Sequence, residues 1–322
     1  MDLIIRHVKK SSHILVATHM NPDGDAIGSL IALGLSLEAL NKKITLYCES
    51  SIPVVYRFLP EVHRVVKKIG GLNYDMAVIL DCGDLSRVGE AVSTVEQIPV
   101  IVNIDHHITN TRFGHLHLID TSACATAEIV YRLIKQMDRP LNKSIATSIY
   151  TGILADTGSF RFSNTNRAAF SICQEMVEIG VDPHDIAQHV YGTYSLSRIK
   201  LLNLALDSIE LSKNGKLSIM TLTKEMFDET HTKPEDVDGL INYAKGIEEV
   251  EVAALIQEHH NGKEQSKTPN RFHISLRSDG TVDVAAIASL FGGGGHSSAA
   301  GFSIESTLSN IKSRIFSLAD KI

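Results

Sequence analysis

The first half of the chain alternates short runs of apolar residues with longer amphipathic stretches. Runs rich in valine and isoleucine predict buried strands at residues 13–18, 44–48, 76–80 and 100–104. Apolar positions at helical spacing predict helices at residues 26–40, 125–137, 144–155 and 166–180. Strands that are apolar on both faces and alternate with helices are typical of a parallel sheet with helices on both faces. The pattern therefore predicts an α/β domain over residues 1–187.

The second half has a different pattern. Residues 188–211 are helical in character and carry no catalytic signature, so we expect a helical linker there. From residue 212 to residue 322, apolar runs at 216–223, 250–257 and 271–277 predict strands, with helices between them. This predicts a smaller C-terminal α/β domain with a mixed sheet, and an active-site cleft between the two domains. The polar residues 259–270 read as a hairpin-like loop.

The composition argues against a protein that binds long duplex nucleic acid and against a membrane-spanning protein. The chain has 322 residues, 31 basic and 37 acidic, and a formal net charge of −6, which argues against an extended basic face for long duplex nucleic acid. We expect no membrane span, because no run reaches the ~20 apolar residues that cross a bilayer. The 4 cysteines form no C-x-x-C pair and are expected to be reduced core thiols. We therefore expect a cytoplasmic protein.

Ionisable residues follow the ends of three predicted strands. They are His19, Asp23 and Asp25 after the first, Asp81 after the third, and Asp105, His106 and His107 after the fourth. A parallel sheet brings the carboxyl ends of its strands to one edge, where open α/β sheets bind their ligands. We expect these side chains to converge there, together with Asp156 from the end of a later helix.

Such a cluster is typical of a metal site. Carboxylates and imidazoles without thiolates suit Mn²⁺, Mg²⁺, Co²⁺, Fe²⁺ or Zn²⁺. So many acids in one place would repel one another, and two divalent ions roughly 3.5–4 Å apart, sharing a carboxylate, would neutralise them. Taken singly, Asp81 could be a turn former and Asp25 a helix cap. The joint pattern at three strand ends favours the metal interpretation.

The motifs carrying these residues resemble those of a known family. "HMNPDGDAIGS", "LDCGD", "DHH" and "ADTGSFRFSNT" are similar, in order and spacing, to the motifs of the DHH phosphoesterase family. "FGGGGHSSAAGF" resembles the glycine-rich motif of the associated DHHA1 domain. The length and two-domain layout resemble the nanoRNase/pAp phosphatase branch. That resemblance implies hydrolysis of oligoribonucleotides of about 2–5 nucleotides to mononucleotides, and conversion of 3′-phosphoadenosine 5′-phosphate (pAp) to AMP.

The resemblance also implies roles for the clustered residues. One ion would be held by His19, Asp23 and Asp81, and the other by Asp25, Asp81, His106 and Asp156, with Asp81 shared. His107 would be catalytic, contacting the phosphate or assisting the leaving oxygen, and Asp105 would orient the histidines. The implied cofactors are two divalent cations, Mn²⁺ in the first place, with Mg²⁺ or Co²⁺ as alternatives. The family includes dimers, so a homodimer is also expected.

Substrate binding is expected in the second domain. Consecutive glycines let a backbone approach an anion and present N–H groups to it, which assigns this role to a loop containing Gly293, Gly294, Gly295 and His296. One glycine would suffice to end the preceding helix. Arg277, at a strand end, is the residue expected to pair with a terminal phosphate, unless it is a solvated strand end. Ser297 departs from the family, which often has Lys, Arg or Pro there.

Two other functions remain open at this point. The same chemistry could act on linear or cyclic dinucleotides such as pApA and c-di-AMP, or on inorganic polyphosphate. The chain could instead be a non-catalytic nucleotide-binding protein that has kept the fold, although a binding module needs no shared carboxylate.

Overall fold

The computed structural model describes residues 1–70, 73–192, 194–237, 239–259 and 270–319. The chain divides into two compact units, unit 1 (Met1–Thr193) and unit 2 (Tyr194–Ile322). Most of the predicted polar loop at 259–270 lies outside the described residues. Within the described residues, no helix is long and apolar enough to cross a membrane.

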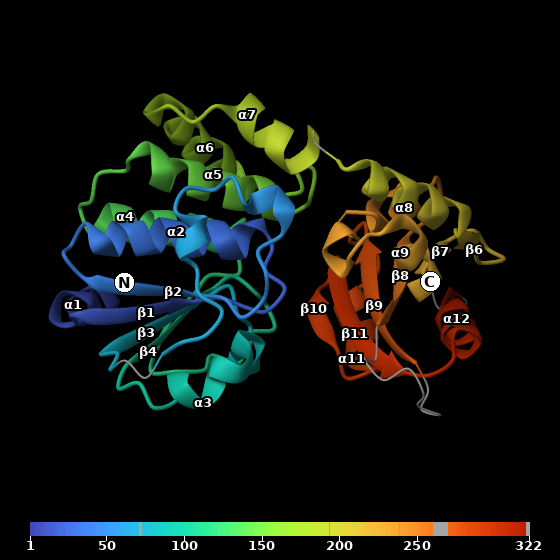
Figure 1. Ribbon diagram of the computed structural model, residues 1–322, viewed down its shortest axis with the longest axis horizontal. Helices are drawn as coiled ribbons and strands as arrows, with labels where there is room; N and C mark the ends of the chain where they lie inside the picture. Colours follow the sequence, from blue (N-terminus) through green and yellow to red (C-terminus); the bar gives the residue numbers. More distant parts are fainter. Residues whose placement is uncertain (71–72, 193, 238, 260–269, 320–322) are drawn as a thin grey trace. The chain divides into compact units, whose positions relative to one another are not determined.

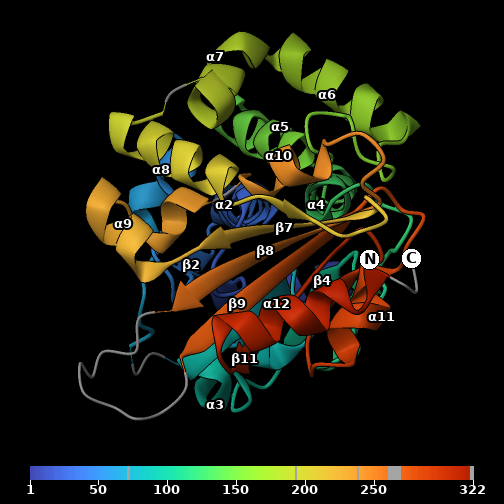
Figure 2. The same ribbon diagram turned by 90° about the vertical axis from the view of Figure 1, so that its right-hand side faces the viewer.

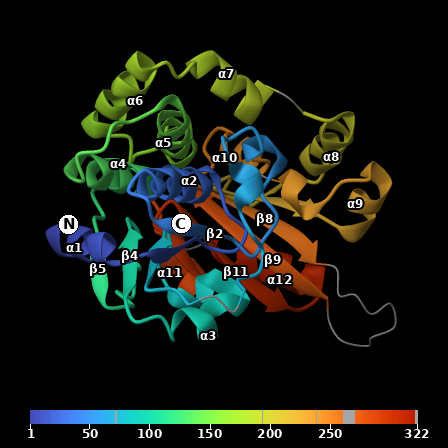
Figure 3. The ribbon, with the colours of Figure 1, turned by 60° about the vertical axis from the view of Figure 1, so that its left-hand side comes forward.

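Unit 1 contains a five-stranded, fully parallel sheet with the strand order β2-β1-β3-β4-β5 (Figures 1 and 3). Its strands are β1 (His13–Ala17), β2 (Lys43–Tyr47), β3 (Met76–Leu80), β4 (Ile101–Asp105) and β5 (Leu116–Ile119). The order reverses between β1 and β3, where such sheets place ligands. The predicted parallel sheet is confirmed.

Helices cover both faces of this sheet, as predicted, but unequally (Figure 3). One face packs against α2 (Gly24–Glu38) and α4 (Thr126–Gln136), and α5 (Lys143–Asp156) forms a second layer on these two helices. Because α2 lies between the sheet and α5, it is buried almost all round, which explains its nearly uniform apolar sequence. The other face is covered by the shorter η3 (Leu85–Ala91) and α3 (Val92–Val95).

The remaining elements of unit 1 lie around this core. They are α1 (Asp2–Lys10), η1 (Val54–Tyr56), η2 (Val62–Arg64), α6 (Arg167–Ile179), α7 (Pro183–Ala187) and the π-helix η4 (Gln188–Gly192). Helix α1 was not predicted, although Ile4, Ile5 and Val8 are buried in the main core. All four cysteines are buried and unpaired.

Unit 2 contains a six-stranded mixed sheet with the order β10-β11-β9-β8-β7-β6 (Figure 2). Its strands are β6 (Glu210–Leu211), β7 (Leu217–Leu222), β8 (Val252–His259), β9 (Arg271–Ser278), β10 (Gly294–His296) and β11 (Ala299–Glu305). Among the described strand pairs of this sheet, β7 and β8 alone are parallel. The predicted mixed sheet is confirmed, but the predicted glycine-rich loop is in part the edge strand β10, whose backbone pairs with β11.

Helices pack on both faces of this second sheet (Figure 2). One face carries α11 (Val284–Ser289) and α12 (Leu308–Phe316). The other carries α8 (Leu196–Asp207), α10 (Ile241–Lys245) and η5 (Pro234–Val237), with α9 (Lys224–Thr230) beside α8. The segment predicted as a linker, 188–211, contributes to both units. Its helix α8 buries Leu201 and Ala205 in the core of unit 2.

Two glycines allow α5 to approach α2 and α4 closely. A Cβ atom on Gly28 would lie 2.4 Å from the carbonyl oxygen of Ser148, and one on Gly152 would lie 2.7 Å from Cβ of Ala127. Both contacts are with a backbone oxygen or a Cβ atom, whose positions are fixed by the helix. A side chain at either glycine would therefore push the helices apart. The crossing matters for the site because α2 carries Asp25 and α5 ends at Asp156.

We predict that Gly28→Ala lowers the free energy of unfolding by about 1–3 kcal/mol, the usual cost of overpacking a core. Urea denaturation monitored by circular dichroism would measure it. Gly70→Ala is the matched control, since a Cβ there meets nothing within 4 Å. An equal effect of the two substitutions would contradict the close crossing.

Candidate metal centre

The acids and histidines predicted at the strand ends come together in unit 1. Ligand atoms lie within 4.8 Å of one another in three groups: His19 with Asp23 and Asp81, Asp25 with His106 and Asp156, and Asp81 with His106 and His107. The cluster lies at the carboxyl edge of the parallel sheet, because β1, β3 and β4 each end beside it. The assignment of these residues as metal ligands stays a prediction.

Asp81 is central to the cluster. Its Oδ2 lies 3.5 Å from Nε2 of His19, and its Oδ1 lies 3.8 Å from Nε2 of His106, so its two oxygens face two different imidazoles. The residue directly follows β3 and has a φ of +58°, in the left-handed region. For a residue other than glycine this conformation costs about 1–2 kcal/mol. Such strain at a buried carboxylate points to a functional constraint.

Two imidazoles are held so that Nε2 faces carboxylates. Nδ1 of His19 donates to the backbone oxygen of Met20 at 2.8 Å, and Nδ1 of His106 donates to that of Ala123 at 3.3 Å. A carbonyl only accepts, so each Nδ1 carries the proton, and in the neutral ring Nε2 then presents a lone pair. Lone pairs that face carboxylate oxygens repel them unless a cation lies between. The donor set therefore fits divalent cations.

The charges of the cluster shift the pKa values of its members. Burial, followed by the charge of Asp81 and Asp156, raises the pKa of Asp25. Burial also raises the pKa of Asp156, to about 7. Although burial alone would lower the pKa of His106, the surrounding carboxylates raise it to about 9. Each of these shifts favours taking up a proton, because burial and neighbouring carboxylates disfavour further negative charge in the cluster.

Helix α4 anchors two of the acids. Asp25 accepts the backbone N–H groups of Thr126 and Ala127 at 2.6 and 2.8 Å, so it caps the first turn of α4, which has no capping side chain of its own. The side chain of Thr126 donates to Oδ1 of Asp81 at 2.9 Å. The sequence offered Asp25 as a cap for its own helix, but α2 is capped by Asp23. Thr126 thus fixes Asp25 and Asp81 together.

Asp156 is fixed by a neighbouring amide. The Nδ2 group of Asn164 donates to Oδ2 of Asp156 at 2.9 Å and also to the backbone oxygen of Cys124 at 2.8 Å. Asn164 lies in the motif "ADTGSFRFSNT", eight residues after Asp156, but its contact with that carboxylate is visible only in the structure. Thr126 was missed altogether, because nothing in its local sequence indicates that its hydroxyl meets an acid 45 residues away.

His107 and Asp105 form a hydrogen-bonded pair. Nδ1 of His107 lies 2.6 Å from Oδ1 of Asp105, a residue with no exposed surface. Burial alone would lower the pKa of His107, but this hydrogen bond and the charge of Asp81 raise it. The predicted orienting contact of Asp105 is present for His107, whereas His106 is oriented by the backbone of Ala123.

The predicted substrate-binding residues lie in unit 2. Arg277 is on β9, opposite Ala299 of β11 and Ala253 of β8, and its Nη1 donates to the backbone oxygen of Leu276 at 3.0 Å. The side chain of His296 is outside the described part of the chain, so its role stays a prediction.

Two of the predicted glycines have structural reasons to be glycine. A Cβ on Gly293 would lie 2.2 Å from the oxygen of Gly301, and Gly295 has a φ of +144° with a Cβ position 2.4 Å from the oxygen of Ala299. Close packing of β10 on β11 therefore requires them, independently of any ligand. Gly294 has nothing within 4 Å of its Cβ position, so it is the glycine around which a ligand has most room.

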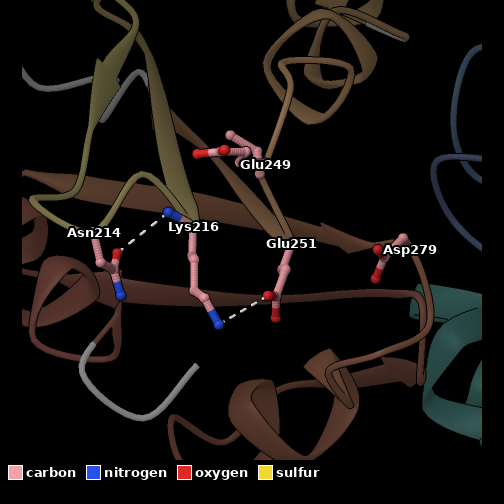
Figure 4. A pocket seen from close by; sticks show the side chains of 6 residues that line it. Asn214, Lys216, Glu249, Glu251 and Asp279 are labelled. Carbon is pink, nitrogen blue, oxygen red and sulfur yellow. Dashed lines mark hydrogen bonds and ion pairs between the residues drawn. The ribbon is translucent and has the colours of Figure 1, made fainter.

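Unit 2 also has a pocket of about 410 Å³ that does not suit a phosphate (Figure 4). Its lining includes Glu249, Glu251 and Asp279, and Lys216 forms an ion pair with Glu251 at 3.0 Å. The three carboxylates disfavour an anion, and the lysine charge is already balanced. None of the predicted site residues lines this pocket.

Two family models match the chain. The model of the DHH family, N-terminal domain, matches residues 13–153, and that of the DHHA1 domain matches residues 214–321. The bifunctional oligoribonuclease and PAP phosphatase NrnA of Thermus thermophilus is 34% identical over 91% of this chain and 84% of that protein. The protein of the same name from Bacillus subtilis is 25% identical over 94% of this chain and 93% of that protein.

A solved structure has the same fold throughout. It is an exopolyphosphatase-related protein from Bacteroides fragilis, with a TM-score of 0.88 and 27% sequence identity, covering 99% of this chain and 94% of that one.

We predict that Thr126→Val weakens the affinity for divalent cations roughly 10–100-fold, as is usual when a group orienting a metal ligand is lost. Calorimetric titration with Mn²⁺ would measure the change. Thr126→Ser keeps the hydroxyl and should restore the affinity.

The matched control is Thr151→Val, which removes a buried hydroxyl that donates within α5 to the backbone of Thr147. It should leave Mn²⁺ affinity unchanged. If Thr126→Val bound Mn²⁺ as tightly as the unmodified protein, the anchoring role of Thr126 would be refuted.

Proposed function

This chain is a member of the DHH family, and from that membership and its cluster of acids and histidines we infer that it is a metal-dependent phosphoesterase. We propose that it hydrolyses oligoribonucleotides of about 2–5 nucleotides to mononucleotides and converts pAp to AMP and phosphate. The names of its relatives from Thermus thermophilus and Bacillus subtilis support these substrates. The observation that carries the proposal is the shared position of Asp81 between His19 and His106.

We propose two Mn²⁺ ions as the cofactors. His19, Asp23 and Asp81 would hold one, and Asp25, His106 and Asp156 would hold the other, with Asp81 shared between them. Nitrogen and oxygen donors without thiolate suit this ion, and also Mg²⁺ or Co²⁺. When bound, such a pair lowers the pKa of a water molecule and polarises the phosphoryl group.

His107 is proposed to protonate the leaving oxygen. Asp105 holds Nδ1 of His107 at 2.6 Å, so the ring orientation is fixed and Nε2 is the nitrogen that can transfer a proton. Although burial alone would lower the pKa of His107, the hydrogen bond to Asp105 raises it, which favours the protonated ring that a general acid needs. A nucleoside leaving group needs that proton because its alkoxide is strongly basic.

The substrate's terminal phosphate is proposed to bind in unit 2. Arg277 offers a guanidinium whose planar fork matches phosphate oxygens. The backbone at Gly294, together with His296, would complete the binding site. Gly293 and Gly295 contribute by allowing β10 to pack closely enough to form it.

Polyphosphate is a second candidate substrate. The solved relative from Bacteroides fragilis carries the description exopolyphosphatase-related and is 27% identical. A cluster that cleaves phosphate esters would also accept a phosphoanhydride, because the attacked group is the same. The rates on linear and cyclic dinucleotides should be measured beside the rate on polyphosphate.

We predict that the Mn²⁺-loaded protein releases mononucleotides from linear diribonucleotides, pApA included, and phosphate from pAp, faster than it cleaves c-di-AMP or polyphosphate. Chromatography of the products would give the rates. Chelation, or Asp81→Asn, should reduce every rate to background, because both proposed ions depend on that carboxylate.

If the protein bound Mn²⁺ and left all of these compounds intact, the proposed phosphoesterase function would be refuted. Faster cleavage of polyphosphate would leave the chemistry in place and replace the substrate class.

We predict that His107→Ala lowers kcat for a diribonucleotide about 10²–10⁴-fold, the range for loss of general acid catalysis. The loss should be much smaller for bis(p-nitrophenyl) phosphate, whose leaving group needs no proton. Steady-state rates on both substrates would measure it. His117→Ala, an exposed histidine on β5, is the control. Equal losses on both substrates would argue for a role of His107 other than proton transfer.

A further inference from the structure

An arginine that is absent from the predicted site lies at its rim. Arg87 belongs to η3, and its Nη2 lies 3.4 Å from Nδ1 of His19. Its side chain is exposed, whereas His19 is buried. Nε2 of the same imidazole faces Asp81, so the guanidinium borders the part of the cluster formed by His19, Asp23 and Asp81.

This contact does not use the hydrogen-bonding capacity of the arginine. Nδ1 of His19 carries a proton that it donates to Met20, so it cannot also accept one from Arg87. Across the described ranges, no ion pair joins Arg87 to a carboxylate. A guanidinium has five N–H donors in a planar fork, and this one belongs to an exposed side chain.

The backbone that carries Arg87 is fixed to the loops of the site. The backbone oxygen of Arg87 accepts from the N–H of Met20 at 2.8 Å. Two residues further on, Gly89 has a φ of +83°, and a Cβ there would lie 1.7 Å from Oε2 of Glu49. That same oxygen accepts from the N–H of Glu90 at 2.6 Å. The segment is therefore held against Met20 and Glu49, close to His19.

The negative charge of the site and of its proposed substrate favours a cation at this position. Five carboxylates gather there, and two divalent cations would neutralise four of their charges. A phosphate monoester adds roughly 1.5–2 negative charges at pH 7. A fixed cation at the rim would offset the resulting repulsion, and the fork of an arginine can bind two phosphate oxygens at once.

We propose that Arg87 binds the substrate's phosphate at the His19 side of the cluster and so contributes to substrate affinity. This inference rests on the proposed phosphoesterase function and adds a substrate-binding residue from unit 1. The alternative is that Arg87 only supports the ring of His19, which would affect metal binding and not phosphate binding.

Arg87→Met tests the proposal by removing the charge while keeping an unbranched side chain. We expect the KM for pAp to rise roughly 10–100-fold, the loss expected for a hydrogen bond to a charged group, with a smaller change in kcat. The dissociation constant of inorganic phosphate, measured by calorimetry on the Mn²⁺-loaded protein, should rise by a similar factor. For Arg87→Lys, the KM for pAp and the dissociation constant of phosphate should lie between the values for Arg87→Met and for the unmodified protein.

Arg6→Met is the matched control, because Arg6 is exposed on α1, ahead of β1 and so at the other edge of the sheet. It should change neither constant. Unchanged KM and phosphate affinity in Arg87→Met would overturn the proposal. So would a fall in Mn²⁺ affinity as large as the fall in kcat/KM. If the unmodified protein does not cleave pAp, the proposed function fails, and phosphate calorimetry still decides the role of Arg87.

Discussion

Unit 1 is organised around the repulsion between buried acids. Carboxylates and imidazole lone pairs face one another within a few ångströms at the carboxyl edge of the sheet, and such an arrangement is stable only when positive charge enters it. The surrounding structure opposes the tendency of these groups to separate. The left-handed backbone of Asp81, the first turn of α4 beneath Asp25 and the amide of Asn164 each fix one acid.

The layered architecture sets the spacing of these acids. Parallel strands with the order β2-β1-β3-β4-β5 bring three strand ends to one edge, and the close crossing of α2 and α5 brings the carboxylates of two helices to the same place. Small residues at the crossing and hydrogen bonds around the acids therefore serve one purpose. Both hold a preformed arrangement, which limits the reorganisation needed when a cation or a phosphate binds.

The sequence was most informative where a local pattern determines the structure. The strands of unit 1 were predicted because continuous apolar runs bounded by polar residues have few other interpretations, and the convergence of Asp81 with His106 followed from the parallel order. Helix α1 was missed although Ile4, Ile5 and Val8 have helical spacing, because the run is short and broken by charged residues. The glycines of β10 resembled a loop, and only the pairing with β11 shows that they form a strand. The sequence did not indicate that Thr126 and Arg87 belong to the site. Their contacts with the cluster are with residues 45 and 68 positions away in the chain.

The hydrogen bond between Thr126 and Asp25 spans 101 residues of the chain. No fragment shorter than that can form the cluster, and closing so long a loop comes late and slowly in folding. An ion that needs the whole cluster would therefore bind only folded molecules, and binding to the native state alone would raise the free energy of unfolding. In a cell, the supply of divalent cation would then govern how long the folded enzyme survives proteolysis as well as how fast it works.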